Sequence, residues 1–241
     1  MAPGGGVAAI VPAAGASRRF GGATSKSFAR LRGLPLLVHA LHALQANPSV
    51  RWIVPVVRAG HEARVARLLR RHRITKALPP RAGGASRAES VAIGFAAVPP
   101  QAGWVLVHDG ARPCVSRRLI ADAIRAARHH GAVACGLPAS LTVKAVDQAR
   151  AVLQTLDRDA LWFVQTPQVF RRAWLAHALA RANGTLRRFP DDAAVLEAAG
   201  FPVRMIPGDP LNLKVTTSDD LMIAEAILKQ RGRRSTAQLS Y

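Results

Sequence analysis

A loop of very small residues follows the first apolar run of the chain, and basic residues come soon after it. Residues 7–11 are uninterruptedly apolar, and residues 13–17 read Ala-Ala-Gly-Ala-Ser. Because these residues carry almost no side chain, a ligand could approach the backbone N–H groups. Arg18, Arg19 and Lys26 then place positive charge where a polyphosphate could lie. The pattern suggests a nucleotide site, and the alternative is an ordinary turn with exposed arginines.

This loop lacks the two common phosphate-binding signatures. It contains no G-x-x-x-x-G-K-[ST] motif, and no G-x-G-x-x-G follows the apolar run. The segment from Pro12 to Phe20, completed by Lys26, resembles instead the N-terminal signature of nucleotidyltransferases. Those enzymes move a nucleoside monophosphate from a triphosphate onto a phosphorylated acceptor. Ser25 stands where they usually have a proline.

A carboxylate at the end of a second apolar run is the next candidate for chemistry. The run 104–107 leads into His108 and Asp109, and Gly-Ala-Arg-Pro then turns the chain. In an open α/β sheet, ligands bind beyond the carboxyl ends of the strands. A carboxylate placed there suits Mg²⁺, which takes few protein oxygens beside substrate phosphates. Asp109 could instead cap the turn; His108 alternates with it and is predicted to pack on the opposite face.

A glycine pair opens a third candidate segment. Gly83 and Gly84 precede Ser86, which is a plausible N-cap with Glu89 three residues later, as in a capping box. The N-terminus of a helix presents free N–H groups that can hold a base edge or a phosphate, here beside Arg87. A plain capped helix is an equally good interpretation of the same residues.

The elements that must position these residues alternate along the chain. Strand-like apolar runs and helical stripes follow one another, which is typical of a parallel sheet with right-handed crossovers. We predict an α/β fold: a doubly wound, mostly parallel, Rossmann-like sheet flanked by helices. Residues 1–231 would form a single domain and 232–241 a disordered tail. Predicted strands are 7–11, 52–57, 104–107, 132–137, 161–170, 202–206 and 212–216; predicted helices are 35–46, 61–72, 87–95, 116–130, 171–182, one opened by 190–192, and 218–230.

One segment breaks this alternation. Residues 141–146 and 151–156 read as the two strands of a β-hairpin, within an arm at about 139–157. A two-stranded ribbon cannot bury its own apolar face. Pairing with a second copy of the chain would bury it, so we predict a homodimer formed through this arm.

Composition limits the classes of function. The formal net charge is +20, but only five of the 34 basic residues are lysines, and basic residues are spread over many segments. Aromatic residues do not interleave with the basic clusters, so we predict no nucleic-acid function. The sequence has no long uninterrupted apolar run, no basic leader, and only Cys114 and Cys135 as cysteines. We therefore expect a cytoplasmic protein without a membrane span.

Taken in order, these motifs resemble the 2-C-methyl-D-erythritol 4-phosphate cytidylyltransferase family from about Val7 to about Gln230. Each motif is weak alone, but six in the right order are specific, above all the third and the fifth. In chain order they are Pro-Ala-Ala-Gly with Arg19 and Lys26, Gly-Gly with Arg87 and Glu-Ser-Val, Val-His-Asp-Gly-Ala-Arg-Pro, Leu-Thr-Val-Lys, Gln-Thr-Pro-Gln, and Asn-Leu-Lys-Val-Thr.

The resemblance implies transfer of CMP from CTP to a sugar-alcohol phosphate, with Mg²⁺ as cofactor. It implies catalytic roles for Arg19, Lys26 and Lys214, and a metal contact at Asp109. Nucleotide contacts would come from Pro12, Ala13, Ala14, Gly15, Gly84, Arg87, Ser90, Asp109 and Gly110. The acceptor would be held by Arg112, Thr142, Thr166 and Lys214, with Arg158 reaching across from the partner subunit.

Three departures from the family pattern leave alternatives open. Ser25 and Ser27 stand where Pro and Gln are usual beside the lysine. Ser140 and Leu141 replace the arginine and aspartate that commonly precede the threonine, and Pro190 replaces a hydroxyl residue. The acceptor could therefore be another sugar-alcohol phosphate, such as ribitol 5-phosphate. A non-catalytic relative that binds nucleotide or nucleic acid is the other alternative.

Overall fold

The computed structural model describes residues 5–15 and 26–237, with side chains up to residue 231. The described residues form a seven-stranded sheet in the order β11-β7-β10-β6-β1-β4-β5. Its strands are β1 (Gly6–Ala13), β4 (Val50–Val57), β5 (Arg81–Ala82), β6 (Ala102–Val107), β7 (Ala132–Pro138), β10 (Trp162–Arg171) and β11 (Arg204–Pro207). All neighbours pair in parallel except β10, which is antiparallel to both β6 and β7. The predicted fold class is confirmed.

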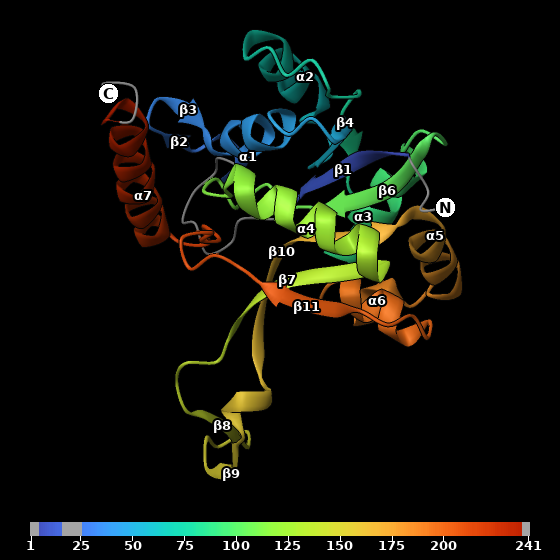
Figure 1. The fold of residues 1–241 in the computed structure, drawn as a ribbon, viewed down its shortest axis with the longest axis vertical. Helices are drawn as coiled ribbons and strands as arrows, with labels where there is room; N and C mark the ends of the chain where they lie inside the picture. The colour runs from blue at the N-terminus through green and yellow to red at the C-terminus, as the bar shows by residue number, and fades with distance from the viewer. Residues whose placement is uncertain (1–4, 16–25, 238–241) are drawn as a thin grey trace.

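The interior strand β1 is apolar throughout because helices cover both faces of the sheet (Figure 1). Val7, Ala9 and Val11 pack with α1 (Leu36–Gln45), α2 (Glu62–Arg71) and α4 (Arg117–His130). Ala8 and Ile10 pack on the other side with α3 (Arg87–Ala96), α5 (Arg172–Arg181) and α6 (Asp192–Ala198). Alternate residues of one strand thus belong to two separate cores.

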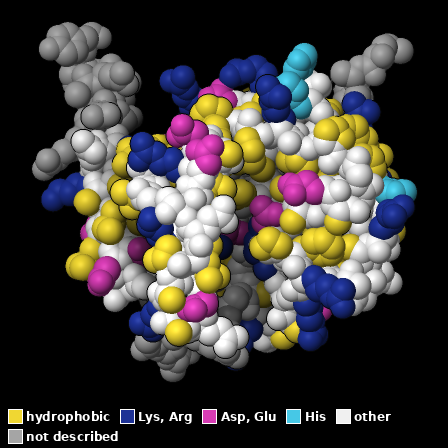
Figure 2. All heavy atoms as spheres, turned by 90° about the horizontal axis from the view of Figure 1, so that it is seen from below, with side chains coloured by type: hydrophobic (Ala, Val, Ile, Leu, Met, Phe, Trp, Pro, Cys, Tyr) yellow, Lys and Arg dark blue, Asp and Glu magenta, His cyan; other side chains and the backbone are white. Residues whose placement is uncertain are grey.

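The predicted arm is present as a separate two-stranded sheet. Strands β8 (Val143–Val146) and β9 (Val152–Leu156) pair antiparallel and project from the body (Figure 1). Val146, Val152 and Leu153 are exposed, as is Leu141 before them. Figure 2 views the molecule from the end at which the arm projects and shows apolar side chains gathered in patches on that face.

The structure differs from two predicted elements in the C-terminal part of the chain. Residues 212–216 do not form a strand; they form a loop held by side chains and by backbone hydrogen bonds from Asn212 N to Asp209 O and from Val215 N to Ala111 O. The last helix, α7, runs from Ser218 to Ala237 and so extends into the segment predicted to be a disordered tail. Arginine and alanine are good helix formers, and basic residues near a helix C-terminus favour its dipole. Residues 238–241 lie outside the described chain.

Both cysteines are buried and free. Burial raises the pKa of the Cys114 thiol to about 11 and that of Cys135 to about 12, so both stay protonated. Among the described residues, no helix has the length and apolar character needed to cross a bilayer.

Candidate active site

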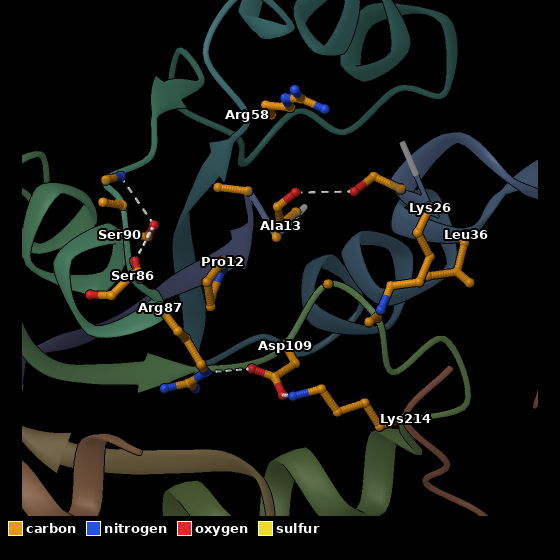
Figure 3. Close-up of a pocket in the computed structure, with 17 residues that line it drawn as sticks. Pro12, Ala13, Lys26, Leu36, Arg58, Ser86, Arg87, Ser90, Asp109 and Lys214 are labelled. Carbon is orange, nitrogen blue, oxygen red and sulfur yellow. Dashed lines mark hydrogen bonds and ion pairs between the residues drawn. The ribbon is translucent and has the colours of Figure 1, made fainter. Parts of the chain in front are cut away.

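A cleft of about 420 Å³ opens where β1, β4, β5 and β6 end (Figure 3). This is the carboxyl edge of the sheet, where ligands of open α/β folds bind. All nine predicted nucleotide contacts line it, together with the predicted catalytic residues Lys26 and Lys214, although they come from five separate parts of the chain: Pro12, Ala13, Ala14, Gly15, Lys26, Gly84, Arg87, Ser90, Asp109, Gly110 and Lys214. Arg19 lies outside the described residues, and its role stays a prediction.

The end of β1 supplies a wall of bare backbone. Ser27 donates a hydrogen bond from its hydroxyl to the carbonyl of Ala13, at 3.2 Å, and so ties the turn that carries Lys26 to this strand (Figure 3). Beside this strand end, Gly83 approaches so closely that a Cβ on it would lie 2.4 Å from the Cβ of Ala14. Small residues are therefore required on both sides.

The N-terminus of α3 forms the opposite wall. Ser86 and Glu89 form the predicted capping box, with both reciprocal hydrogen bonds present. The hydroxyl of Ser90 accepts from Gly84 N at 3.2 Å and donates to the Ser86 carbonyl at 2.9 Å (Figure 3). Glu89 Oε1 also forms an ion pair with Arg187 Nε at 2.7 Å. The glycine turn is thus fixed to the first turn of the helix.

Asp109 is the electrostatic centre of the cleft. Its Oδ1 accepts from Arg87 Nε at 2.9 Å, and its Oδ2 lies 2.8 Å from Lys214 Nζ and 3.8 Å from Arg112 Nε (Figure 3). Burial alone would raise the pKa of Asp109, but the charges of Arg87 and Lys214 outweigh it and hold that pKa well below its usual value. The carboxylate is therefore ionised at every pH at which the protein would work.

Two predicted acceptor residues, Arg112 and Thr166, are buried behind Asp109 rather than lining the cleft. Thr166 Oγ1 accepts from Asp109 N at 3.0 Å and lies 3.1 Å from His108 Nδ1. Arg112 donates to the carbonyl of Asn212 at 2.8 Å. His108 is fully buried, and burial lowers its pKa to about 4, so it packs as a neutral side chain, as predicted.

The Gln-Thr-Pro-Gln motif of β10 joins three segments of the site. Gln165 bonds both the N–H and the carbonyl of Asp209, in the loop that leads to Lys214. Thr166 holds the loop of Asp109, as described above. Gln168 donates to Asp191 Oδ2 at 2.9 Å and accepts from Ala193 N at 3.1 Å, which fixes the start of α6. The motif positions other residues and does not itself line the cleft.

The remaining predicted acceptor residues lie on or beside the arm. Thr142 immediately precedes β8, and Arg158 follows β9, with its guanidinium 3.5 Å from the Ser140 carbonyl. Neither is among the described residues that line the cleft of their own chain. The prediction that Arg158 reaches into the site of a second subunit stays a prediction, as does the acceptor role of Thr142.

Sequence reasoning missed two residues that the fold brings to this region. Arg58 follows β4 and lines the cleft on the side opposite Asp109 and Lys214 (Figure 3). Its signal was a basic residue directly after a buried strand. Asp192, at the start of α6, lies 2.8 Å from Arg87. The sequence feature that could have pointed to Asp192 is its place beside Asp191, because one acid suffices to cap the helix.

The donor set fits a magnesium ion that arrives with a polyphosphate. Asp109 offers carboxylate oxygens to the cleft, and Mg²⁺ commonly takes one or two protein carboxylates with substrate phosphates and water. Within the described part of the chain, no three His, Cys, Asp or Glu side chains gather as a complete metal cage. Asp109 would thus share the ion with the phosphates of a bound substrate.

Comparison with known proteins agrees with this geometry. The family model for 2-C-methyl-D-erythritol 4-phosphate cytidylyltransferase matches residues 7–230. A protein of that name from Pelotomaculum thermopropionicum is 40% identical over 232 residues, which cover 95% of this chain and 96% of that protein. A bifunctional IspD/IspF enzyme from Desulforudis audaxviator is 44% identical over 223 residues, covering 91% of this chain and 56% of its own.

Solved structures give the same result. The crystal structure of 4-diphosphocytidyl-2C-methyl-D-erythritol synthase from Anaerococcus prevotii superposes with a TM-score of 0.81 at 27% identity, over 93% of this chain and 99% of that one. The 2-C-methyl-D-erythritol 4-phosphate cytidylyltransferase of Thermus thermophilus superposes with a TM-score of 0.75 at 33% identity, with the same coverage.

Proposed function

The chain belongs to the 2-C-methyl-D-erythritol 4-phosphate cytidylyltransferase family, and from this premise we propose how its cleft performs CMP transfer from CTP. The products are 4-diphosphocytidyl-2-C-methyl-D-erythritol and pyrophosphate, in the non-mevalonate route of isoprenoid biosynthesis. A phosphate oxygen of the acceptor attacks the α-phosphorus of CTP. The bond from the α-phosphorus to the bridging oxygen breaks, and pyrophosphate leaves with that electron pair.

Such a reaction needs alignment and charge neutralisation more than covalent chemistry. The backbone of Ala13 and Ala14, facing Gly84 and Ser90, would hold the cytosine. Lys26 and Lys214 would neutralise the negative charge that grows on the phosphate oxygens, together with Arg19. Lys26 and Lys214 come from distant parts of the chain and line the same cleft only because of the fold.

Asp109 has a double task in this proposal. Its ion pair with Lys214, at 2.8 Å, holds the ammonium group toward the cleft. Asp109 would also be the protein ligand of Mg²⁺. Gly110 and Pro12, which line the cleft as well, would contact the ribose of CTP. The ion, when bound, supplies further neutralisation of the triphosphate.

The acceptor would lie between the cleft and the arm of a second subunit. Lys214 would hold its phosphate end, and the partner's Thr142 and Arg158 would complete the pocket. Arg112 and Thr166, which lie behind Asp109, would serve the acceptor by fixing the loop of that carboxylate. The exposed apolar residues of the arm support a homodimer, because a lone ribbon leaves them in water. We also propose a cytoplasmic location, in keeping with two free buried cysteines.

The observation that carries the proposal is the ion cluster of Asp109 with Lys214 and Arg87 beside a cleft walled by bare backbone. The test is pyrophosphate release by purified protein with each of four nucleoside triphosphates and two acceptors, 2-C-methyl-D-erythritol 4-phosphate and ribitol 5-phosphate. We expect release with CTP and the first acceptor. Pyrophosphate release with ribitol 5-phosphate only would overturn the assignment of the acceptor. RNA binding without any pyrophosphate release would overturn the assignment as an enzyme.

A further inference from the structure

A second acid lies behind the cleft, and the mechanism above gives it no task. Asp192 is the first residue of α6 and is only 2% exposed. Its Oδ2 lies 2.8 Å from Nη1 of Arg87, which reaches it from α3. Asp192 does not line the cleft, so it does not meet the substrate directly.

The helix start does not need this carboxylate. Asp191 is the N-cap of α6 and accepts from Ala194 N at 2.9 Å, while Gln168 binds its other oxygen. Asp192 makes neither of these bonds, and within the described residues its Oδ2 has no well-formed hydrogen bond beyond the ion pair. Two adjacent acids therefore have separate tasks, one in capping and one in holding Arg87.

Arg87 is fixed between two carboxylates. Its Nη1 faces Asp192 on one side, and its Nε donates to Asp109 Oδ1 at 2.9 Å on the other. A guanidinium has its donors in a rigid plane, so a carboxylate that fixes one end also sets the direction of the other. The ion pair with Asp192 thus draws Nη1 toward α6 and limits the directions from which Nε can meet Asp109.

Stability alone is a poor explanation for this arrangement. Burying an acid is costly, and a buried ion pair often adds little that apolar packing could not supply. Burial raises the pKa of Asp192, and the nearby charge of Arg87 offsets only part of that penalty. A charge kept under those conditions is better explained by what it orients.

We propose that Asp192 is a positioning residue for cytidylyl transfer: through Arg87 it fixes the carboxylate of Asp109, and with it the ammonium of Lys214. The chain of contacts runs Asp192–Arg87–Asp109–Lys214, with each step between 2.8 and 2.9 Å. Arg87 accordingly acts on Asp109 as well as lining the nucleotide cleft. This inference rests on the proposed function, because turnover is its readout.

A double-mutant cycle tests it. Asp192→Asn should lower kcat/KM by about 10- to 100-fold, the usual loss when a residue that orients a site ligand is changed. Arg87→Met should lower it at least as much. The double variant should be no worse than Arg87→Met alone, because Asp192 acts only through Arg87. A purely structural role for Asp192 would lower activity whether or not Arg87 is present.

A neighbouring substitution gives the matched control. Asp191→Asn removes the same charge from the same helix start and keeps an N-cap acceptor, but it leaves Arg87 untouched, so activity should stay near that of the parent protein. If Asp192→Asn does not fold, the kcat/KM of the double variant is compared with that of Arg87→Met alone. The double variant removes both members of the ion pair and so leaves neither charge buried without its partner. Parent-like turnover of Asp192→Asn, or additive losses in the cycle, would overturn the proposal. Absence of turnover in the parent protein would instead refute the proposed function.

Discussion

Two lysines far apart in the sequence, Lys26 and Lys214, line the same cleft. Lys214 is held by Asp109, whereas Lys26 stands on a short helical turn that Ser27 fastens to the end of β1. A cation fixed in advance costs little reorganisation when negative charge grows on a phosphate. The two side chains are therefore expected to act on the transition state more than on binding.

Removing the Lys26 ammonium should affect turnover and leave the fold intact. We predict that Lys26→Ala lowers kcat by roughly 100-fold, as loss of one transition-state donor does. Lys229→Ala removes the same group from an exposed position of α7 and is the control. Steady-state kinetics and thermal unfolding measure both effects. Near-normal kcat in Lys26→Ala would remove this lysine from the mechanism.

The start of α7 steadies the loop that carries Lys214. Asp220 Oδ2 accepts from Thr216 N at 2.7 Å and from Thr217 N at 2.8 Å, and Thr217 Oγ1 accepts from Asp220 N in return. Partial burial would raise the pKa of Asp220, but these hydrogen bonds outweigh it and lower the pKa to about 2. The bonds also anchor the chain two residues after Lys214.

This lowered pKa has a consequence for stability. A carboxylate with a depressed folded-state pKa stabilises the protein fully above its unfolded value, near pH 4, and loses that contribution as pH falls toward 2. We predict that Asp220→Asn lowers stability by about 1 kcal/mol at pH 7, with the difference vanishing near pH 2. Thermal melts from pH 7 to 2 measure it, with the exposed neighbour Asp219→Asn as control. A deficit that is constant over that range would contradict the role of the charge.

The sequence predicts local features of this fold better than distant ones. The two-faced burial of β1, the capping box of Ser86, and Asp109 at a strand end all follow from patterns within about ten residues. The loop of Lys214 was mistaken for a strand, because its apolar residues pack on α7 and not across a sheet. The pairing of Asp192 with Arg87 depends on where α3 and α6 lie in space, which no local pattern encodes.

The arm, β8 and β9, exposes apolar side chains that nothing in a single chain covers among the described residues. Leu153 is 68% exposed and Val152 is 61% exposed on a ribbon with no core of its own. We predict that Leu153→Glu shifts the protein from dimer to monomer in light scattering after gel filtration. Met222→Glu, at an equally exposed apolar position on α7, should not. A parent protein that is already monomeric would exclude this interface.

If the arm of one subunit reaches the cleft of the other, each active site contains residues of both subunits. Mixing inactive Lys26→Ala and Arg158→Ala chains, with exchange of subunits, should restore about a quarter of the parent activity, because half of the dimers are mixed and each has one intact site. This holds only if Arg158 serves the partner's cleft. If activity does not recover on mixing, although mass spectrometry shows that subunits have exchanged, Arg158 does not act in the cleft of the partner subunit.

A crystal structure with CTP and Mg²⁺ bound decides whether the cleft is the nucleotide site. We predict cytosine between the backbone of Ala13 and Ala14 and the turn of Gly84, with the triphosphate beside Lys26 and Lys214. A nucleotide bound on another face, or these lysines directed away from its phosphates, would contradict the assignment.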